Sequence, residues 1–94
     1  MNLETLSASE NQLITDWLNT KRSPHTQRCY RLDLETFLAD LGTELGKFLS
    51  LDRHGAYALV SRYKGQMIQL GLKSPTINRR LAVIKSLVSY AYNC

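Results

Sequence analysis

The sequence predicts an all-α domain, a small bundle of four helices, and three observations lead to this fold class. Apolar residues recur every three or four positions along four segments, which is the period of an amphipathic helix. Proline and glycine separate these segments from one another. No segment shows the alternation of apolar and polar residues that is typical of a strand. The 94 residues are expected to form a single domain, 1–94, with a modest core.

The first helix is expected over residues 7–20. Ser7-x-x-Glu10 is a capping box, in which the serine and glutamate side chains each accept a hydrogen bond from a free backbone N–H. Apolar side chains then follow at helical spacing, at Leu13, Ile14, Trp17 and Leu18.

The second and fourth helices, over residues 23–41 and 74–92, are expected to begin alike. Ser23 and Ser74 act as N-caps, and a proline follows each at the first helical position, where a missing N–H costs nothing. Gly42 ends the second helix in a left-handed conformation. The apolar stripes of the two helices are Tyr30, Leu34, Phe37, Leu38 and Leu41, and then Ile77, Leu81, Ile84, Leu87, Val88 and Ala91.

The third helix is expected over residues 52–70, with Asp52 as its N-cap and Gly71 after its end. Its apolar stripe is Ala56, Leu59, Val60, Tyr63, Met67 and Leu70. Residues 42–52 are expected to form a loop that packs Phe48, Leu49 and Leu51 against the core.

The charged residues are unevenly distributed along the chain. Residues 1–52 hold eight acidic and five basic residues, whereas residues 53–94 hold seven basic residues and no acidic one. Such asymmetry favours a polyanionic partner, with an ordinary solvated surface as the alternative.

Several classes of protein are excluded at this stage. No apolar run has the length of a membrane span, and the first residues lack the pattern of a signal peptide, so a cytoplasmic protein without membrane contact is expected. Cys29 and Cys94 do not indicate a disulfide framework. His25 and Cys29 can share a helical face, but two ligands do not make a zinc site, so no metal and no cofactor are expected.

A helical projection of residues 74–92, at about 100° per residue, places Arg79 nearly opposite the buried stripe. Ala82, Val83 and Ser86 lie beside it, so this face could approach a major groove closely. Arg79→Ala is therefore expected to weaken DNA binding without affecting folding. Arg80 and Lys85 flank the stripe, where they either contact DNA or simply extend to solvent.

The second helix carries a comparable basic face. Arg28 and Arg31 lie away from its apolar stripe, and both proline-started helices place a threonine in their first turn. Helix N-termini attract phosphates, which is compatible with the capping role of the serines. The candidate DNA-binding residues are Thr26, Arg28, Arg31, Lys73, Thr76, Asn78, Arg79, Arg80 and Lys85.

Two stretches resemble a known family. SPHTQRCYRLDLETFLADL, at residues 23–41, resembles the second helix of the N-terminal core-binding domain, a SAM-like domain, of tyrosine recombinases of the phage integrase family. SPTINRRLAVIKSLVSYAY, at residues 74–92, is similar to the fourth helix of that domain. The matching positions are Ser23, Thr26, Tyr30, Asp33, Leu34 and Phe37, and then Ser74, Thr76, Ile77, Asn78, Arg79 and Leu81, with Lys85 where the family commonly has arginine.

The resemblance implies a domain that grips duplex DNA with its second and fourth helices for DNA integration and recombination. In that family the catalytic residues belong to a C-terminal domain, so this chain is expected to be a non-catalytic part of a longer recombinase, with the catalytic domain as its partner. His25-x-x-Arg28 has the spacing of a catalytic box of the family, but it falls in the first turn of the second helix and the rest of the box does not follow.

Two other classes of function remain open. The chain could be a helical protein-interaction module, in which Leu32 and Val83 form a small apolar patch. It could also be a helix-turn-helix regulator, although the long connection at residues 42–52 disfavours a short turn before a recognition helix. A regulator of that class should dimerise, whereas an isolated core-binding domain is expected to be a monomer.

Overall fold

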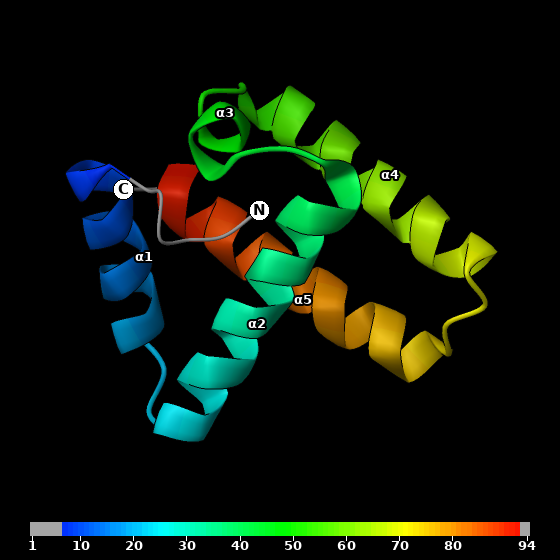
Figure 1. Cartoon of the computed structure of the whole chain (residues 1–94), viewed down its shortest axis with the longest axis horizontal. Coiled ribbons are helices and arrows are strands. Elements are labelled where there is room, and N and C mark those ends of the chain that lie inside the picture. The colour runs from blue at the N-terminus through cyan, green and yellow to red at the C-terminus, as the bar shows by residue number, and fades with distance from the viewer. Residues whose placement is uncertain (1–6, 93–94) are drawn as a thin grey trace.

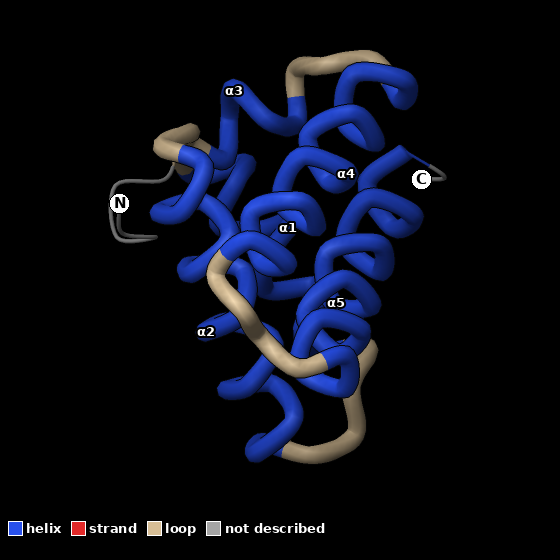
Figure 2. The backbone as a smooth tube through the Cα atoms, turned by 90° about the vertical axis from the view of Figure 1, so that its right-hand side faces the viewer, coloured by secondary structure: helices blue, strands red, loops and turns tan. Residues whose placement is uncertain are grey.

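The computed structural model describes residues 7–92, which form five helices (Figure 1). Their bounds are α1 Ala8–Asn19, α2 Pro24–Leu41, α3 Leu45–Leu49, α4 Arg53–Gln69 and α5 Ser74–Tyr92. The described part of the chain contains no strand (Figure 2). The predicted all-α fold class is confirmed, and α3 is an addition to the four predicted helices.

The predicted helix ends are confirmed at most positions. Ser7 and Glu10 form both hydrogen bonds of the capping box, at 3.2 and 2.9 Å. The Ser23 hydroxyl accepts hydrogen bonds from the first turn of α2, and the Asp52 carboxylate accepts one from the Gly55 N–H. Gly42 ends α2 with a φ of 62°, in the left-handed region that favours glycine.

The predicted loop at residues 42–52 contains the short helix α3. Leu45 and Phe48, one turn apart, are both buried and attach α3 to the core. Leu49 and Leu51 pack partly buried against the core, as predicted, and the Tyr92 hydroxyl of α5 donates to the Leu51 carbonyl oxygen. Five residues are too few to show a helical period in the sequence, which explains why this helix was missed.

The start of α5 differs from the prediction by one residue. The helix begins at Ser74, and the Ile77 N–H donates to the Lys73 carbonyl oxygen at 3.1 Å. Pro75 therefore stands at the second helical position and Ser74 lies inside the helix, where it was expected to be the cap. In α2 the corresponding bond runs from Gln27 to Ser23, in agreement with the prediction for that helix.

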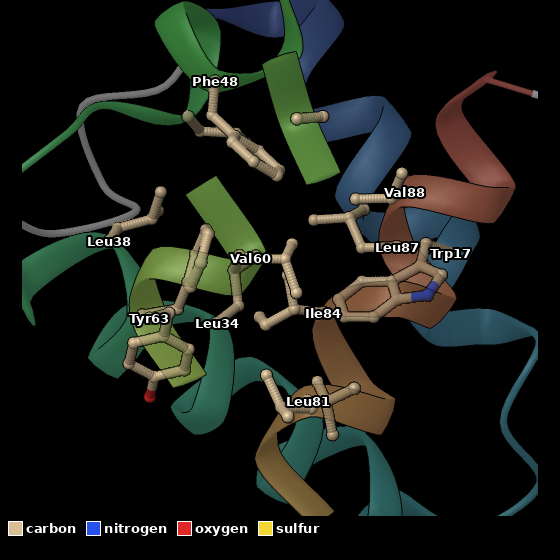
Figure 3. Packing of buried hydrophobic residues seen from close by; sticks show 14 of the residues in the cluster. Trp17, Leu34, Leu38, Phe48, Val60, Tyr63, Leu81, Ile84, Leu87 and Val88 are labelled. Atoms are coloured by element: carbon tan, nitrogen blue, oxygen red, sulfur yellow. The ribbon is translucent and has the colours of Figure 1, made fainter. Parts of the chain in front are cut away.

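Two packing arrangements organise the domain. In the first, α4 and α5 are joined by a short turn and pack side by side in opposite directions (Figure 1). In the second, α2 crosses α5, and α1 packs against both of them on the side away from α4. The core lies between them, with Trp17, Leu34 and Ile84 among its fully buried residues (Figure 3). The Phe37 ring meets the rings of Phe48 and Tyr63 edge-on, at centroid distances of 5.1 and 5.0 Å.

The predicted apolar stripes form this core, with two exceptions. Leu70, at the C-terminal end of α4, is 72% exposed, because the helix ends there and the chain turns away. Val83 is 2% exposed, although the projection of α5 placed it near Arg79 on the outer side. Because α1, α2 and α4 all pack on α5, the buried arc of this helix is wider than the sequence indicated.

Candidate nucleic-acid interface

An ion pair joins α2 and α5 where they cross. Arg79 Nη1 donates to Asp33 Oδ2 at 2.5 Å. The Asp33 side chain is 6% exposed, whereas that of Arg79 is 53% exposed. A carboxylate that is nearly buried needs such a partner, because an unpaired charge in the interior is costly. Asp33 is the buried charged residue among the described residues, and Arg79 neutralises it.

The ion pair corrects the expectation that Arg79 simply points away from the protein. Its side chain is exposed over half of its surface, but its guanidinium is bound to α2. A helical projection of α5 shows only the faces of that helix. It cannot predict the contact with Asp33, because α2 is not part of the projection. Arg79 thus remains accessible to solvent, while its guanidinium is held at α2 by the ion pair with Asp33.

The face of α5 near Ser86 is covered by α1. The Ser86 hydroxyl accepts hydrogen bonds from Trp17 Nε1 at 3.1 Å and from Lys21 Nζ at 3.3 Å. The small residues of α5 were expected to let this face approach a groove. Ala82 is exposed, as that expectation requires. At Ser86, however, α1 packs closely against α5 and occupies the position that was expected to be open.

Lys21 is a cation of this region that the sequence analysis did not single out. It lies in the connection between α1 and α2, and its Nζ is 4.8 Å from the centroid of the Tyr30 ring. Tyr30 in turn packs against Trp17, with ring centroids 5.7 Å apart. Lys21 precedes the Ser23–Pro24 helix start and belongs to no apolar period, so its place at the crossing depends on the tertiary structure.

Arg80 is turned partly into the protein, toward α4. Its Nε atom and the Tyr63 hydroxyl are both buried, and neither has a hydrogen-bond partner among the described residues. Burial raises the pKa of Tyr63, and the neighbouring Arg80 guanidinium opposes that effect. Of the two predicted residues that flank the stripe, Lys85 is exposed and Arg80 is half-buried.

The remaining candidates lie on the surfaces of α2, α5 and the turn before α5. Thr26 and Thr76 are half-buried in the first turns of their helices. The exposed candidates are Arg28 and Arg31 on α2, Lys73 in the turn, and Asn78 and Lys85 on α5. The structure thus joins one candidate, Arg79, directly to α2. The other exposed candidates extend from the surfaces of α2 and α5 and from the turn before α5.

The described residues contain no group of three or more His, Cys, Asp or Glu side chains that could hold a metal ion. Cys29 Sγ lies 3.7 Å from His25 Nε2, so these two residues do share a helical face. Cys94 lies outside the described residues. Within residues 7–92, no helix combines the length and the apolar character needed to cross a membrane.

The surface features behind the two alternative functions also differ from expectation. Leu32 is 62% exposed but Val83 is buried, so the predicted patch of these two residues does not form. Other exposed apolar side chains, Ile68 and Leu70, lie at the end of α4. The three residues 50–52 connect α3 to α4, so a short turn between helices does exist. Its supposed absence no longer counts against a helix-turn-helix protein.

The chain is similar to a known protein family and to two curated proteins. The family model described as phage integrase, N-terminal SAM-like domain, matches residues 12–93. A tyrosine recombinase of Synechocystis sp. is 41% identical over 92 residues, which cover 92% of this chain and 29% of that protein. A tyrosine recombinase of Synechococcus elongatus is 39% identical over 103 residues, which cover 94% of this chain and 32% of that protein. The chain thus spans about a third of the length of these relatives, and no solved structure matches it significantly.

Proposed function

This chain belongs to the phage integrase family through its N-terminal SAM-like domain, and from that membership we propose that it is the DNA-binding domain of a site-specific tyrosine recombinase. It grips duplex DNA with α2 and α5, and its function is DNA integration or recombination. The domain itself is not catalytic. Strand cleavage requires the catalytic domain of the same parent chain, which is the protein partner that we propose.

The observation that carries the proposal is the set of exposed cations on two joined helices. Arg28 and Arg31 extend from α2, and Lys85 extends from α5, while Arg79 connects the two. Lys and Arg side chains on adjacent helices neutralise phosphates, and this sequence-independent term supplies nearly all of the free energy of non-specific DNA binding. Asn78, also exposed on α5, has the donor and acceptor that can read an adenine edge in the major groove.

The alternatives receive less support. A protein-interaction module would use exposed apolar surface, and the predicted patch at Leu32 and Val83 is absent. A helix-turn-helix regulator would place a recognition helix after a short turn, which here is α4 after the five-residue α3. Family membership favours the recombinase over both. We also propose that the isolated domain is a monomer and that the recombinase acts in the cytoplasm.

An NMR titration of the labelled chain with a generic duplex, at low and at higher salt, tests the proposal. We expect shifts concentrated on residues 23–35 and 74–86, which weaken as the salt concentration rises, because phosphate contacts release counterions. Shifts confined to the α3–α4 region would favour the regulator. No shift at low salt would contradict the proposal.

A further inference from the structure

We propose that Lys21, in the connection between α1 and α2, binds a DNA phosphate at the seam where α2 crosses α5. The inference extends the proposed function to a third element and rests on that function. The seam is defined here as Tyr30 and Asp33 of α2 together with Ser86 of α5. The two cations that contact these residues are Lys21 and Arg79.

Lys21 is held in place at both its backbone and its side chain. Its N–H donates to the Leu18 carbonyl oxygen at 3.0 Å, and its carbonyl oxygen accepts from Gln27 Nε2 at 3.2 Å. Its ammonium group reaches the Ser86 hydroxyl of α5 and lies over the Tyr30 ring of α2. A lysine ordered in this way has already lost much of the side-chain freedom that binding would otherwise remove.

The residues that contact Lys21 lie near Asp33 and Arg79 on the two helices. Arg79 and Ser86 are seven residues apart on α5, so they project to nearly the same side of that helix, about 10 Å apart at about 1.5 Å of rise per residue. On α2, Tyr30 and Asp33 are about one turn apart. The Tyr30 ring contacts the ammonium group of Lys21, and the Asp33 carboxylate pairs with Arg79. Lys21 and Arg79 therefore each bridge α2 and α5, at neighbouring positions along both helices.

The surroundings of the two cations differ in charge. Arg79 is paired with a nearly buried carboxylate, whereas Lys21 contacts a hydroxyl and an aromatic ring, neither of which carries a charge. No carboxylate of residues 7–92 forms an ion pair with Lys21. An ammonium group has three donors, and one of them is used by Ser86. Lys21 is thus the unneutralised cation of the seam, and a phosphate is the ligand that its free donors and its charge suit.

The salt dependence of DNA binding tests the inference, because each phosphate contact adds about one unit to the slope of log K against log salt concentration. We expect Lys21→Met, which replaces the lysine with an unbranched side chain that carries no charge, to lower the magnitude of the slope by about one. Lys21→Arg should keep the wild-type slope. Binding of a generic duplex to the full chain would be measured by fluorescence anisotropy at salt concentrations from about 50 to about 200 mM. The affinity of a protein that contacts phosphates falls steeply over this range, so the slope can be resolved.

Two controls make the outcomes distinct. Lys64→Met removes an exposed lysine of α4, which lies far from the α1–α2 connection in Figure 1, and should leave the slope unchanged. Lys21→Gln keeps a donor for Ser86 and replaces Lys21→Met if that variant does not fold, as judged by circular dichroism. A wild-type slope in the neutral variant that folds would overturn the inference, as would an equal loss in Lys21→Arg. If the wild-type chain itself does not bind DNA, the proposed function fails instead.

Discussion

At the scale of single residues, the ion pair with the Asp33 carboxylate gives Arg79 a role in the stability of the fold. A buried acceptor that loses its donor retains the full cost of its desolvation. The side chain of Arg79 therefore serves the folded state as well as any DNA that it contacts. This dual role revises the expectation that its removal leaves folding unaffected.

We predict that Arg79→Ala lowers the free energy of unfolding by about 1–3 kcal/mol, because Asp33 is left without its partner. Urea denaturation of the purified chain measures this. The matched control is Lys85→Ala, an exposed residue of the same helix, whose effect should stay within about 0.5 kcal/mol. Adding Asp33→Asn to Arg79→Ala should recover part of the loss, since the unpaired charge is then gone. Equal stability of the two alanine variants would show that the ion pair contributes nothing.

Tyr63 gives a second prediction at this scale. Burial raises its pKa above the usual 10.0, so the folded chain holds the phenolic proton more tightly than the unfolded chain does. The free energy of unfolding should therefore fall as the pH rises above about 10. Below that pH, Tyr63→Phe should cost little, because the hydroxyl has no hydrogen-bond partner among the described residues.

Urea denaturation at pH 8 and at pH 10.5 would check this expectation. The loss of stability between the two should be smaller in Tyr63→Phe than in the wild type. Some loss remains, since burial also raises the pKa of Tyr92. Tyr57→Phe, at a side chain that is 40% exposed, is the matched control. An identical loss in Tyr63→Phe and wild type would contradict the assignment.

At the scale of the elements, local chemistry determines most helix ends, with the start of α5 as the exception, but it does not determine which helix faces are buried. The caps at Ser7, Ser23 and Asp52 and the left-handed Gly42 follow from single residues and their immediate neighbours, and the structure confirms each of them. The buried arc of α5 depends on three neighbouring helices, which is why Val83 was assigned to the wrong side.

The glycines at the end of α2 and inside α4 allow a matched pair of substitutions. Gly42→Ala should destabilise the fold by about 1–2 kcal/mol, because φ is 62° at this position. Gly65→Ala should stabilise it by about 0.5–1 kcal/mol, since an exposed site inside a helix favours alanine and a Cβ there meets nothing within 4 Å. Thermal unfolding of both variants compares the two signs directly. A shift of the same sign in both would contradict the backbone assignment.

At the scale of the whole molecule, the described residues form one core to which all five helices contribute. Trp17 from α1, Phe37 from α2, Phe48 from α3, Tyr63 from α4 and Ile84 from α5 are each at most 1% exposed. A domain in which every helix contributes to one core does not need a second copy to bury its apolar surface.

We therefore predict that the chain sediments as a monomer without DNA and shows no preference for palindromic duplexes. Analytical ultracentrifugation and competition between palindromic and scrambled duplexes measure the two properties. A stable dimer that selects a palindrome would instead indicate a regulator whose two-fold symmetry matches that of its site.

The fold class, the caps of three helices, most helix bounds and the family could be predicted from the sequence alone, because helical period, capping chemistry and short motifs are local properties of the chain. The predicted cap at Ser74 was wrong. The exposed candidates Arg28 and Arg31 could also be assigned to an outer face in this way. Only the tertiary structure decided that Asp33 holds Arg79, that α1 covers Ser86, and that Lys21 lies at the crossing of α2 and α5. Each of these contacts joins residues at least 46 positions apart, and which helices cross, and where, depends on the packing of the whole core.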